Sequence, residues 1–271
     1  MPINLSPQPS KTLASPLAHL IDRLRTAEVL LEPFPHYYLE NVFPDDYYQT
    51  LLSKLPESAI YQNLFEVTTL KLDHFRHRDQ RDLNEGWTAS LTGDIKDFWD
   101  SFNEWFLGPD LAHAVMGSFC SQLCASFGEE QSWPEVLVES QLIRHRAGYF
   151  LQPHSDLYTK LIVLLLYLAP DESAAHLGTS LYRPKKAGFS CPDSIHHSFD
   201  DFVRVKTAAY KPNSLLAFVR SDVSFHGLDP LSEDDLTKGG RDVIQYTLHD
   251  KRAREEQLRA KRLTTGKQVI A

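Results

Sequence analysis

The second half of the chain carries the feature that most limits its fold, a series of short β-prone segments. Six such runs follow one another between Val136 and His249, and turn-forming residues separate them. The runs are VLVESQLIRH, KLIVLLLYL, GTSLYRP, FVRVKTAAY, NSLLAFVR and RDVIQYTLH. Short strands at such close spacing are typical of a β-sandwich or a β-barrel, so this half is predicted to form one of the two.

The first half is predicted to contribute helices. Apolar residues recur at helical spacing over 17–31 and again over about 94–127. Between these stretches, an aromatic segment at 33–43 favours a strand, and Pro44 followed by two acids favours the start of another helix. We therefore expect a helical layer, mainly about 94–127, packed against a β core of about 136–250.

Three segments lack this periodicity. Residues 1–16 are rich in Pro and Ser and are predicted to form a flexible N-terminal arm. Residues 60–93 mix charge, aromatics and glycine, which favours a long surface loop, with a lid over a site as the alternative. Residues 251–271 are rich in charge, with little apolar content, and are predicted to be an exposed helix or tail. Between arm and tail, 17–250 is predicted to be a single domain.

Charge and cysteine content exclude several classes of protein. The 271 residues carry a formal charge of -8, which argues against binding to nucleic acid or to an anionic membrane. The three cysteines form neither a disulfide framework nor a zinc ribbon, and Cys120 and Cys124 are predicted to be core thiols. The longest apolar run, 161–169, is far shorter than the roughly 20 residues of a spanning helix. A cytoplasmic location is therefore expected.

Two fragments of the β half contain candidate metal ligands. His154 and Asp156 are two residues apart beside a predicted strand, so both side chains can turn toward one point. His226 follows another predicted strand, and Gly227 leaves space beside it. Two imidazoles and one carboxylate suit Fe(II), because they leave coordination positions open. The alternative is that His226 only caps a turn.

Arg241 opens the last predicted strand, fifteen residues after His226. A guanidinium can hold a carboxylate through two parallel hydrogen bonds. If the metal lies nearby, Arg241 would hold one end of a dicarboxylate while the other end binds the metal.

This order of residues resembles the Fe(II)- and 2-oxoglutarate-dependent oxygenases, in particular their bacterial prolyl 4-hydroxylase-like branch. The resemblance is carried by QLIRHRAGYFLQPHSDLYTKLIVLLLYLAPDESAAHLGTSLYRP and KPNSLLAFVRSDVSFHGLDPL, and more loosely by PFPHYYLENVFPDDYYQTLLSKLP. It implies a mainly β fold with flanking helices, a double-stranded β-helix (jelly-roll, cupin-like barrel) with iron in its mouth.

The resemblance also implies a role for each site residue. His154, Asp156 and His226 become the iron ligands and the catalytic centre, and Arg241 binds the distal carboxylate of 2-oxoglutarate. His145 stands where relatives often carry a tyrosine that binds this cosubstrate, so it is either a second cosubstrate contact or a plain strand histidine. Lys160 is a weaker candidate than Arg241 for the carboxylate.

The activity implied is hydroxylation of an unactivated C–H bond in a small metabolite, amino acid or peptide-like substrate. Fe(II), 2-oxoglutarate and O₂ would be consumed or bound, succinate and CO₂ released, and ascorbate is a candidate reductant. The carboxylate of Asp156 disfavours halogenation, whereas desaturation and cyclisation stay open. Two other classes are considered, a catalytically silent jelly-roll binding module and a cupin-like metalloenzyme without cosubstrate. Substrate identity and oligomeric state are not visible in the sequence.

The substrate pocket is expected where irregular segments surround the barrel mouth. These segments are 60–93 and 187–201, and Arg144 or Arg146 beside the iron-binding block is a candidate partner for an acidic group of the substrate. Four other histidines are predicted to be solvated or to pack within loops: His74, His77, His196 and His197.

Overall fold

The computed structural model describes residues 15–84, 86–236 and 240–265. Most of the predicted arm and the end of the predicted tail, residues 1–14 and 266–271, lie outside the described residues. In the part of the chain that is described, no helix is both long and apolar enough to cross a bilayer.

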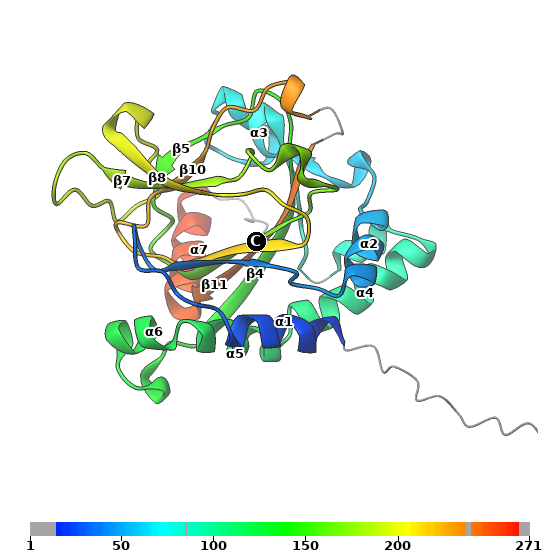
Figure 1. Ribbon diagram of the computed structural model, residues 1–271, viewed down its shortest axis with the longest axis horizontal. Coiled ribbons are helices and arrows are strands. Elements are labelled where there is room, and N and C mark those ends of the chain that lie inside the picture. The colour runs from blue at the N-terminus through cyan, green and yellow to red at the C-terminus, as the bar shows by residue number, and fades with distance from the viewer. Residues whose placement is uncertain (1–14, 85, 237–239, 266–271) are drawn as a thin grey trace, which may run out of the picture.

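Two antiparallel sheets face each other and form a jelly-roll barrel, a double-stranded β-helix (Figure 1). The larger sheet has seven strands in the order β1 (His36–Glu40), β9 (Ser214–Val219), β6 (Lys160–Tyr167), β11 (Arg241–Asp250), β4 (Val136–His145), β3 (Arg78–Asp82) and β2 (Gln62–Asn63). The smaller sheet has four, in the order β5 (Leu151–His154), β10 (His226–Leu228), β7 (Thr179–Pro184) and β8 (Phe202–Ala208). The predicted fold class is confirmed.

Helices cover the outer face of the larger sheet (Figure 1). These helices are α1 (Pro16–Arg25), α2 (Asp45–Ser53), α4 (Gly93–Phe106), α5 (Pro109–Ser118) and α6 (Cys120–Phe127). The short helix α3 (Leu64–Val67) instead packs against the cluster between the sheets, and α7 (Lys251–Thr265) contacts β11 and β4. Short 3₁₀ turns lie at Ser58–Ile60, Asp73–His77, Trp87–Ser90, Glu130–Ser132, Glu172–Ala174, Phe199–Asp201 and Asp234–Leu236.

The side chains of β11 alternate between the two faces of the larger sheet. Ile244, Tyr246 and Leu248 belong to the cluster under the helices, whereas Val243 belongs to the cluster between the sheets. The ring of Phe106 meets that of Tyr246 edge-on at 5.1 Å, which anchors α4 to the sheet.

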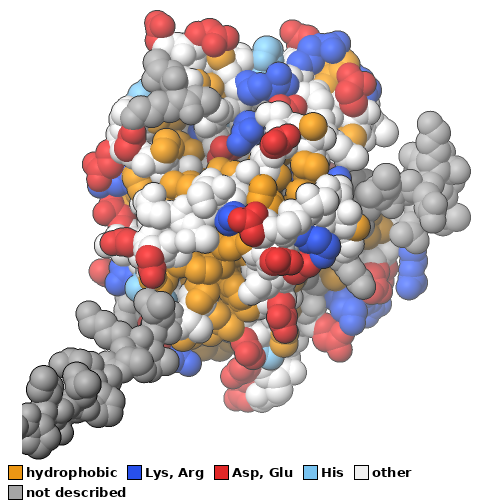
Figure 2. Space-filling view, turned by 90° about the vertical axis from the view of Figure 1, so that its right-hand side faces the viewer, with side chains coloured by type: hydrophobic (Ala, Val, Ile, Leu, Met, Phe, Trp, Pro, Cys, Tyr) orange, Lys and Arg blue, Asp and Glu red, His pale blue; other side chains and the backbone are white. Residues whose placement is uncertain are grey.

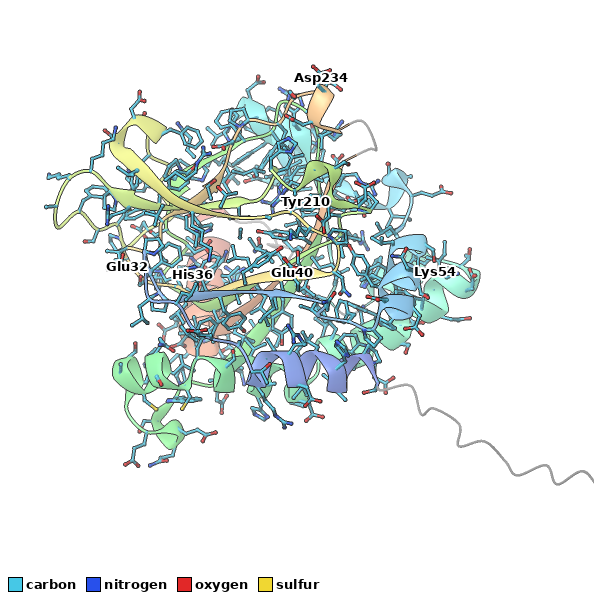
Figure 3. The ribbon with its side chains drawn as sticks, viewed as in Figure 1. Glu32, His36, Glu40, Lys54, Tyr210 and Asp234 are labelled. Atoms are coloured by element: carbon cyan, nitrogen blue, oxygen red, sulfur yellow. The ribbon has the colours of Figure 1, made fainter. Side chains whose placement is uncertain are left out.

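A hydrogen bond also joins α4 to its neighbour α2. The indole nitrogen of the fully buried Trp99 donates at 2.7 Å to the backbone oxygen of Lys54, the residue labelled at the end of α2 in Figure 3. The helical layer is thus tied together at the point where it meets the sheet.

All six predicted strands are present, and the predicted helical stretch 94–127 is confirmed as α4, α5 and α6. The helix predicted over 17–31 is shorter than expected, because it ends at Arg25. The prediction of core thiols is wrong: Cys120 and Cys124 are exposed on α6, which turns Leu123 to the core, and Cys191 is the buried cysteine.

The segment 60–93 is not the plain loop predicted for it. It contains α3 and the hairpin of β2 and β3, and β3 pairs with β4 as part of the larger sheet. The strand was missed because its sequence, RDQRD, is polar throughout and every residue is half-buried. Hydrophobic alternation, on which strand prediction depends, is absent where a strand lines a polar cavity.

The surface seen in Figure 2 carries acidic and basic side chains interspersed around apolar patches. Charge of one sign does not gather over this face.

The C-terminal helix α7 is held against the barrel by a buried ionic cluster. Arg254 donates to both carboxylate oxygens of Glu139 on β4, at 2.6 and 2.8 Å. His249 of β11 lies 3.4 Å from the same carboxylate, and Thr159 contacts the other ring nitrogen at 3.0 Å. Burial raises the pKa of Glu139, but His249 and Arg254 outweigh burial and hold it at about 2.

Glu139→Gln should therefore destabilise the fold by ~1–3 kcal/mol at neutral pH, because Arg254 loses its charged partner in a half-buried site. Urea unfolding of this variant, of Arg254→Met and of the double variant gives the coupling free energy between Glu139 and Arg254. Since folding depresses the pKa of Glu139, the coupling is complete above the unfolded value of about 4.3 and is lost as the pH falls toward 2. Glu135→Gln, which breaks the exposed pair with Lys251, is the control. A coupling near zero at pH 7 would contradict this account of α7.

Candidate metal centre

The smaller sheet brings His154 and His226 side by side. His154 ends β5, His226 begins β10, and the two are direct partners in the antiparallel pair. Gly227 permits this pairing, because a Cβ atom there would lie 2.4 Å from the backbone oxygen of Leu151. The glycine after His226 thus has a structural reason, which is the close approach of β10 to β5.

Asp156 completes a compact group. One ligand atom from each of His154, Asp156 and His226 lies within 4.8 Å of the others, and the three side chains are buried. The Nε2 atom of His226 is 3.6 Å from Oδ2 of Asp156, and the two imidazole rings are 4.4 Å apart. The structure therefore brings together the three residues that the sequence singled out as metal ligands.

The hydrogen bonds of His154 and His226 occupy Nδ1 of each ring and leave Nε2 free to bind a metal ion. Nδ1 of His154 lies 3.0 Å from the backbone oxygen of Gln152, and Nδ1 of His226 lies 3.0 Å from that of Ser224. An Nδ1–H that donates to a carbonyl leaves the lone pair on Nε2, the usual arrangement of a metal-ligating histidine. Oδ2 of Asp156 is buried without a hydrogen-bond partner. An orphaned carboxylate oxygen beside two Nε2 atoms fits a divalent cation.

The electrostatics of the group also favour ligation. Burial lowers the pKa of both His154 and His226, so both rings are neutral at pH 7. Burial raises the pKa of Asp156, but the Lys160 ammonium and the two imidazoles outweigh it and hold this pKa well below its usual range. Lys160 reaches Oδ1 of Asp156 at 2.6 Å. Neutral imidazoles and an ionised carboxylate are the forms that bind metal, so no proton has to be displaced at neutral pH.

Arg241 lies in the same cavity, and its side chain is buried. Its guanidinium donates to the backbone oxygen of Leu177 at 2.6 Å and to Thr179 at 3.3 Å. The rings of Tyr167 and Tyr210 lie 5.3 and 5.1 Å from it. Within the described residues all of these partners are uncharged, so the guanidinium is positioned but not neutralised.

His145 is the neighbour of Arg241 on β4. The two residues are register partners, and Nδ1 of His145 is 3.2 Å from a guanidinium nitrogen of Arg241. Burial, Arg241 and Arg78 all lower the pKa of His145, so Nδ1 accepts from Arg241 as a neutral ring. Stacking on Tyr149 at 4.2 Å fixes the ring. His145 thus orients Arg241, and its direct contact with a cosubstrate stays a prediction.

These residues line a cavity of about 560 Å³ between the two sheets. Its wall includes Leu64 and Phe75 from 60–93 and Ser194 and His196 from 187–201, as expected from the sequence. The ring of His196, predicted to be a loop residue, lies 5.1 Å from that of His154. The size is within the usual range for small-molecule sites.

Arg144 and Arg146 are not in the cavity wall. Arg144 pairs with Asp242 at 2.7 and 3.0 Å, and Arg146 pairs with Asp79 at 3.0 Å. The alternation of β4 turns Arg144 away from the side of His145, and Arg146, which follows the end of β4, is held by Asp79, so neither is placed to meet a substrate. The arginines that do line the cavity besides Arg241 are Arg78 and Arg254, which the sequence analysis missed.

A larger cleft of about 1010 Å³ lies outside the barrel, between α5, α6, β4 and α7. It is lined largely by apolar side chains, among them Leu107, Met116 and Trp133. The His154–Asp156–His226 group is the one cluster with metal-ligand geometry among the described residues, and it belongs to the smaller cavity.

Comparison with known proteins identifies the fold. No protein-family model matches the sequence, and no curated protein matches it. A prolyl hydroxylase from Trichoplax adhaerens, solved with a hypoxia inducible factor oxygen degradation domain peptide fragment, aligns over 88% of this chain and 91% of its own, at 12% identity and a TM-score of 0.50. A Pseudomonas putida prolyl-4-hydroxylase aligns over 86% and 98%, at 15% identity and a TM-score of 0.45. HygX from Streptomyces hygroscopicus aligns over 80% and 83%, at 13% identity and a TM-score of 0.44.

The chain has the fold of the 2-oxoglutarate oxygenases. The alignment with the Trichoplax prolyl hydroxylase spans most of both chains, so it includes the barrel and the helices packed on it. The resemblance seen in the sequence is thereby confirmed at the level of fold.

Proposed function

We propose that the chain is an Fe(II)- and 2-oxoglutarate-dependent dioxygenase that hydroxylates an unactivated C–H bond of a small-molecule or peptide-like substrate, with release of succinate and CO₂. The observation that carries the proposal is one cavity that contains both a His–Asp–His group and a buried guanidinium without a charged partner among the described residues. The shared fold with a prolyl hydroxylase supports it.

Each residue has a defined task under this proposal. His154, Asp156 and His226 would hold Fe(II) and leave positions open for other ligands. Arg241, oriented by His145, would bind the far carboxylate of 2-oxoglutarate through a bidentate pair. Bound together, Fe(II), 2-oxoglutarate and O₂ supply an oxidant capable of attacking an unactivated C–H bond.

The chain itself contributes position and environment. Backbone carbonyls fix the two imidazoles with Nε2 toward Asp156, and the sheets bury the group away from bulk water. A pre-formed, dry site costs little reorganisation during the reaction. Asp156 contributes a carboxylate rather than an open position, which favours hydroxylation over halogenation.

Two alternative functions fit the geometry less well. A catalytically silent binding module has no need for three buried ligands with free donor atoms, yet all three are in place. A cupin-like metalloenzyme without cosubstrate would leave Arg241 as a buried cation without a counter-ion, which is costly.

Succinate formation tests the proposal. The purified full-length chain is incubated in air with Fe(II), ascorbate and 2-oxoglutarate, with and without a pool of small metabolites and peptides. We expect succinate in amounts that depend on Fe(II) and rise with the pool. Complete absence of succinate with every pool would favour the binding module.

A further inference from the structure

A second arginine besides Arg241 lines the cavity, and it bears on which substrates the proposed dioxygenase accepts. This inference rests on the function proposed above. Arg78 lies on β3, the strand that the sequence did not reveal, and it lines the same cavity as the metal group. Arg78 and Arg241 are both register partners of His145, on the two strands that flank β4. Register partners on adjacent strands point to the same face of a sheet, so both arginines project between the two sheets.

Arg78 is near enough for its charge to act on His145 and Arg241, but its side chain hydrogen-bonds to another residue. One of its terminal nitrogens donates to Oε1 of Gln141 at 3.3 Å, and Gln141 is four residues from His145 along β4. The side chain therefore leans along the sheet, away from the row of His145 and Arg241. Two arginines on one row thus present their charges at different places in the cavity.

Arg78 makes no direct ion pair among the described residues, although its charge acts on the nearby carboxylate of Asp82. Its hydrogen bond to Gln141 is long and neutral, and its Nε is buried without a partner. The nearby carboxylate of Asp82 is taken up by the amide of Gln141 at 2.7 Å, and that of Glu139 by Arg254. A guanidinium has five donors, so most of those of Arg78 are free for a ligand.

The cavity as a whole carries more positive than negative side chains. Four cations, Arg78, Lys160, Arg241 and Arg254, face two carboxylates, Glu139 and Asp156. Fe(II) and the 2-oxoglutarate dianion carry equal and opposite charges, so their binding leaves the positive excess in place. A substrate that carries a negative charge would offset it.

We propose that Arg78, supported by Gln141, binds a carboxylate of the substrate, and that the substrates of this chain are small organic acids. A planar carboxylate matches the fork of a guanidinium, and the amide of Gln141 holds that fork in place. Arg78 is then a specificity residue: Arg241 serves the cosubstrate and Arg78 serves the substrate.

The test uses the full-length chain loaded with Zn(II), which does not support turnover, and with 2-oxoglutarate. The probes are free amino acids, N-acetylated amino acids and hydroxy acids, each paired with its primary amide. Ligand-observed NMR finds the compounds that bind, and calorimetry gives their affinities. We expect at least one acid to bind in preference to its amide, and Arg78→Gln to weaken that acid by about tenfold or more, the loss typical of a charged hydrogen bond. Arg78→Lys should recover part of the affinity.

Arg81→Gln is the matched control, because Arg81 lies on the same strand and turns to the opposite face. It should leave acid binding unchanged. The inference is overturned if no acid is preferred to its amide, if Arg78→Gln binds the acid as the wild type does, or if Arg78→Gln loses affinity for 2-oxoglutarate, which would make Arg78 a cosubstrate residue. Failure of the wild type to bind 2-oxoglutarate in the presence of Zn(II) would instead contradict the proposed function.

Discussion

Replacing His154 or Asp156 by alanine should abolish stoichiometric metal binding and succinate formation while the fold is retained. Each of these side chains contributes one atom to a group of three, and a divalent ion held by only two protein atoms is bound weakly. We expect the affinity for Mn(II) or Fe(II) to fall by more than about 100-fold, since even residues that merely orient a ligand contribute 10- to 100-fold. Anaerobic calorimetry measures the affinity, and circular dichroism checks the fold.

His196→Ala is the control for this experiment. The ring of His196 lies 5.1 Å from that of His154, but the residue is not part of the ligand group. Metal binding should survive in this variant. Full metal affinity in Asp156→Ala, or its loss in His196→Ala, would show that a different set of side chains holds the metal.

Arg241→Gln should weaken the binding of 2-oxoglutarate and leave the binding of the metal unchanged. A bidentate pair between the guanidinium and the far carboxylate of 2-oxoglutarate contains two charge-assisted hydrogen bonds, each of about 1.5–3 kcal/mol. We therefore expect the affinity for 2-oxoglutarate to fall by about 100-fold or more in the presence of Mn(II), as measured by calorimetry. Turnover should fall with it at low 2-oxoglutarate concentration.

Arg241→Lys separates the effect of the positive charge from that of the hydrogen-bond geometry of the guanidinium. Lysine keeps the cation but cannot reproduce the hydrogen bonds to Leu177 and Thr179 together with a bidentate pair, so an intermediate affinity is expected. Mn(II) affinity and unfolding temperature, recorded for both variants, show whether the site has survived. Unchanged 2-oxoglutarate affinity in Arg241→Gln would remove Arg241 from the proposed mechanism.

The candidate group of His154, Asp156 and His226 could be assembled from the sequence because its signals are local. His154 and Asp156 are two residues apart, and His226 carries its glycine directly behind it. Each fragment adjoins a strand whose apolar residues mark it clearly, so the positions of the ligands relative to the barrel followed from the strand pattern. Arg241 was found in the same way, at the start of a strongly β-prone run.

The substrate side of the cavity could not be found in this way. β3 is polar on both faces, so neither the strand nor the inward direction of Arg78 was visible in the sequence. Arg144 and Arg146 were chosen because they are close to the site along the chain. Alternation on β4 turns Arg144 outward to Asp242, and Arg146, just past the end of β4, pairs with Asp79. Closeness in sequence is a poor guide within a strand, since neighbours face opposite sides.

The contact between α7 and the barrel was hidden for a related reason. Charge along 251–271 predicted an exposed segment, and the side chains of 251–260 are indeed exposed or half-buried. Arg254 is different because Glu139, more than a hundred positions earlier, lies opposite it. Such a pairing depends on the register of β4 and β11, which only the folded structure supplies.

A crystal structure of the full-length chain grown without oxygen in the presence of Mn(II) and 2-oxoglutarate tests the central claim most directly. The account predicts one ion bound by Nε2 of His154, Nε2 of His226 and the carboxylate of Asp156, with 2-oxoglutarate on that ion and its far carboxylate on Arg241. An ion bound elsewhere with this group left empty, or 2-oxoglutarate bound away from Arg241, would contradict it.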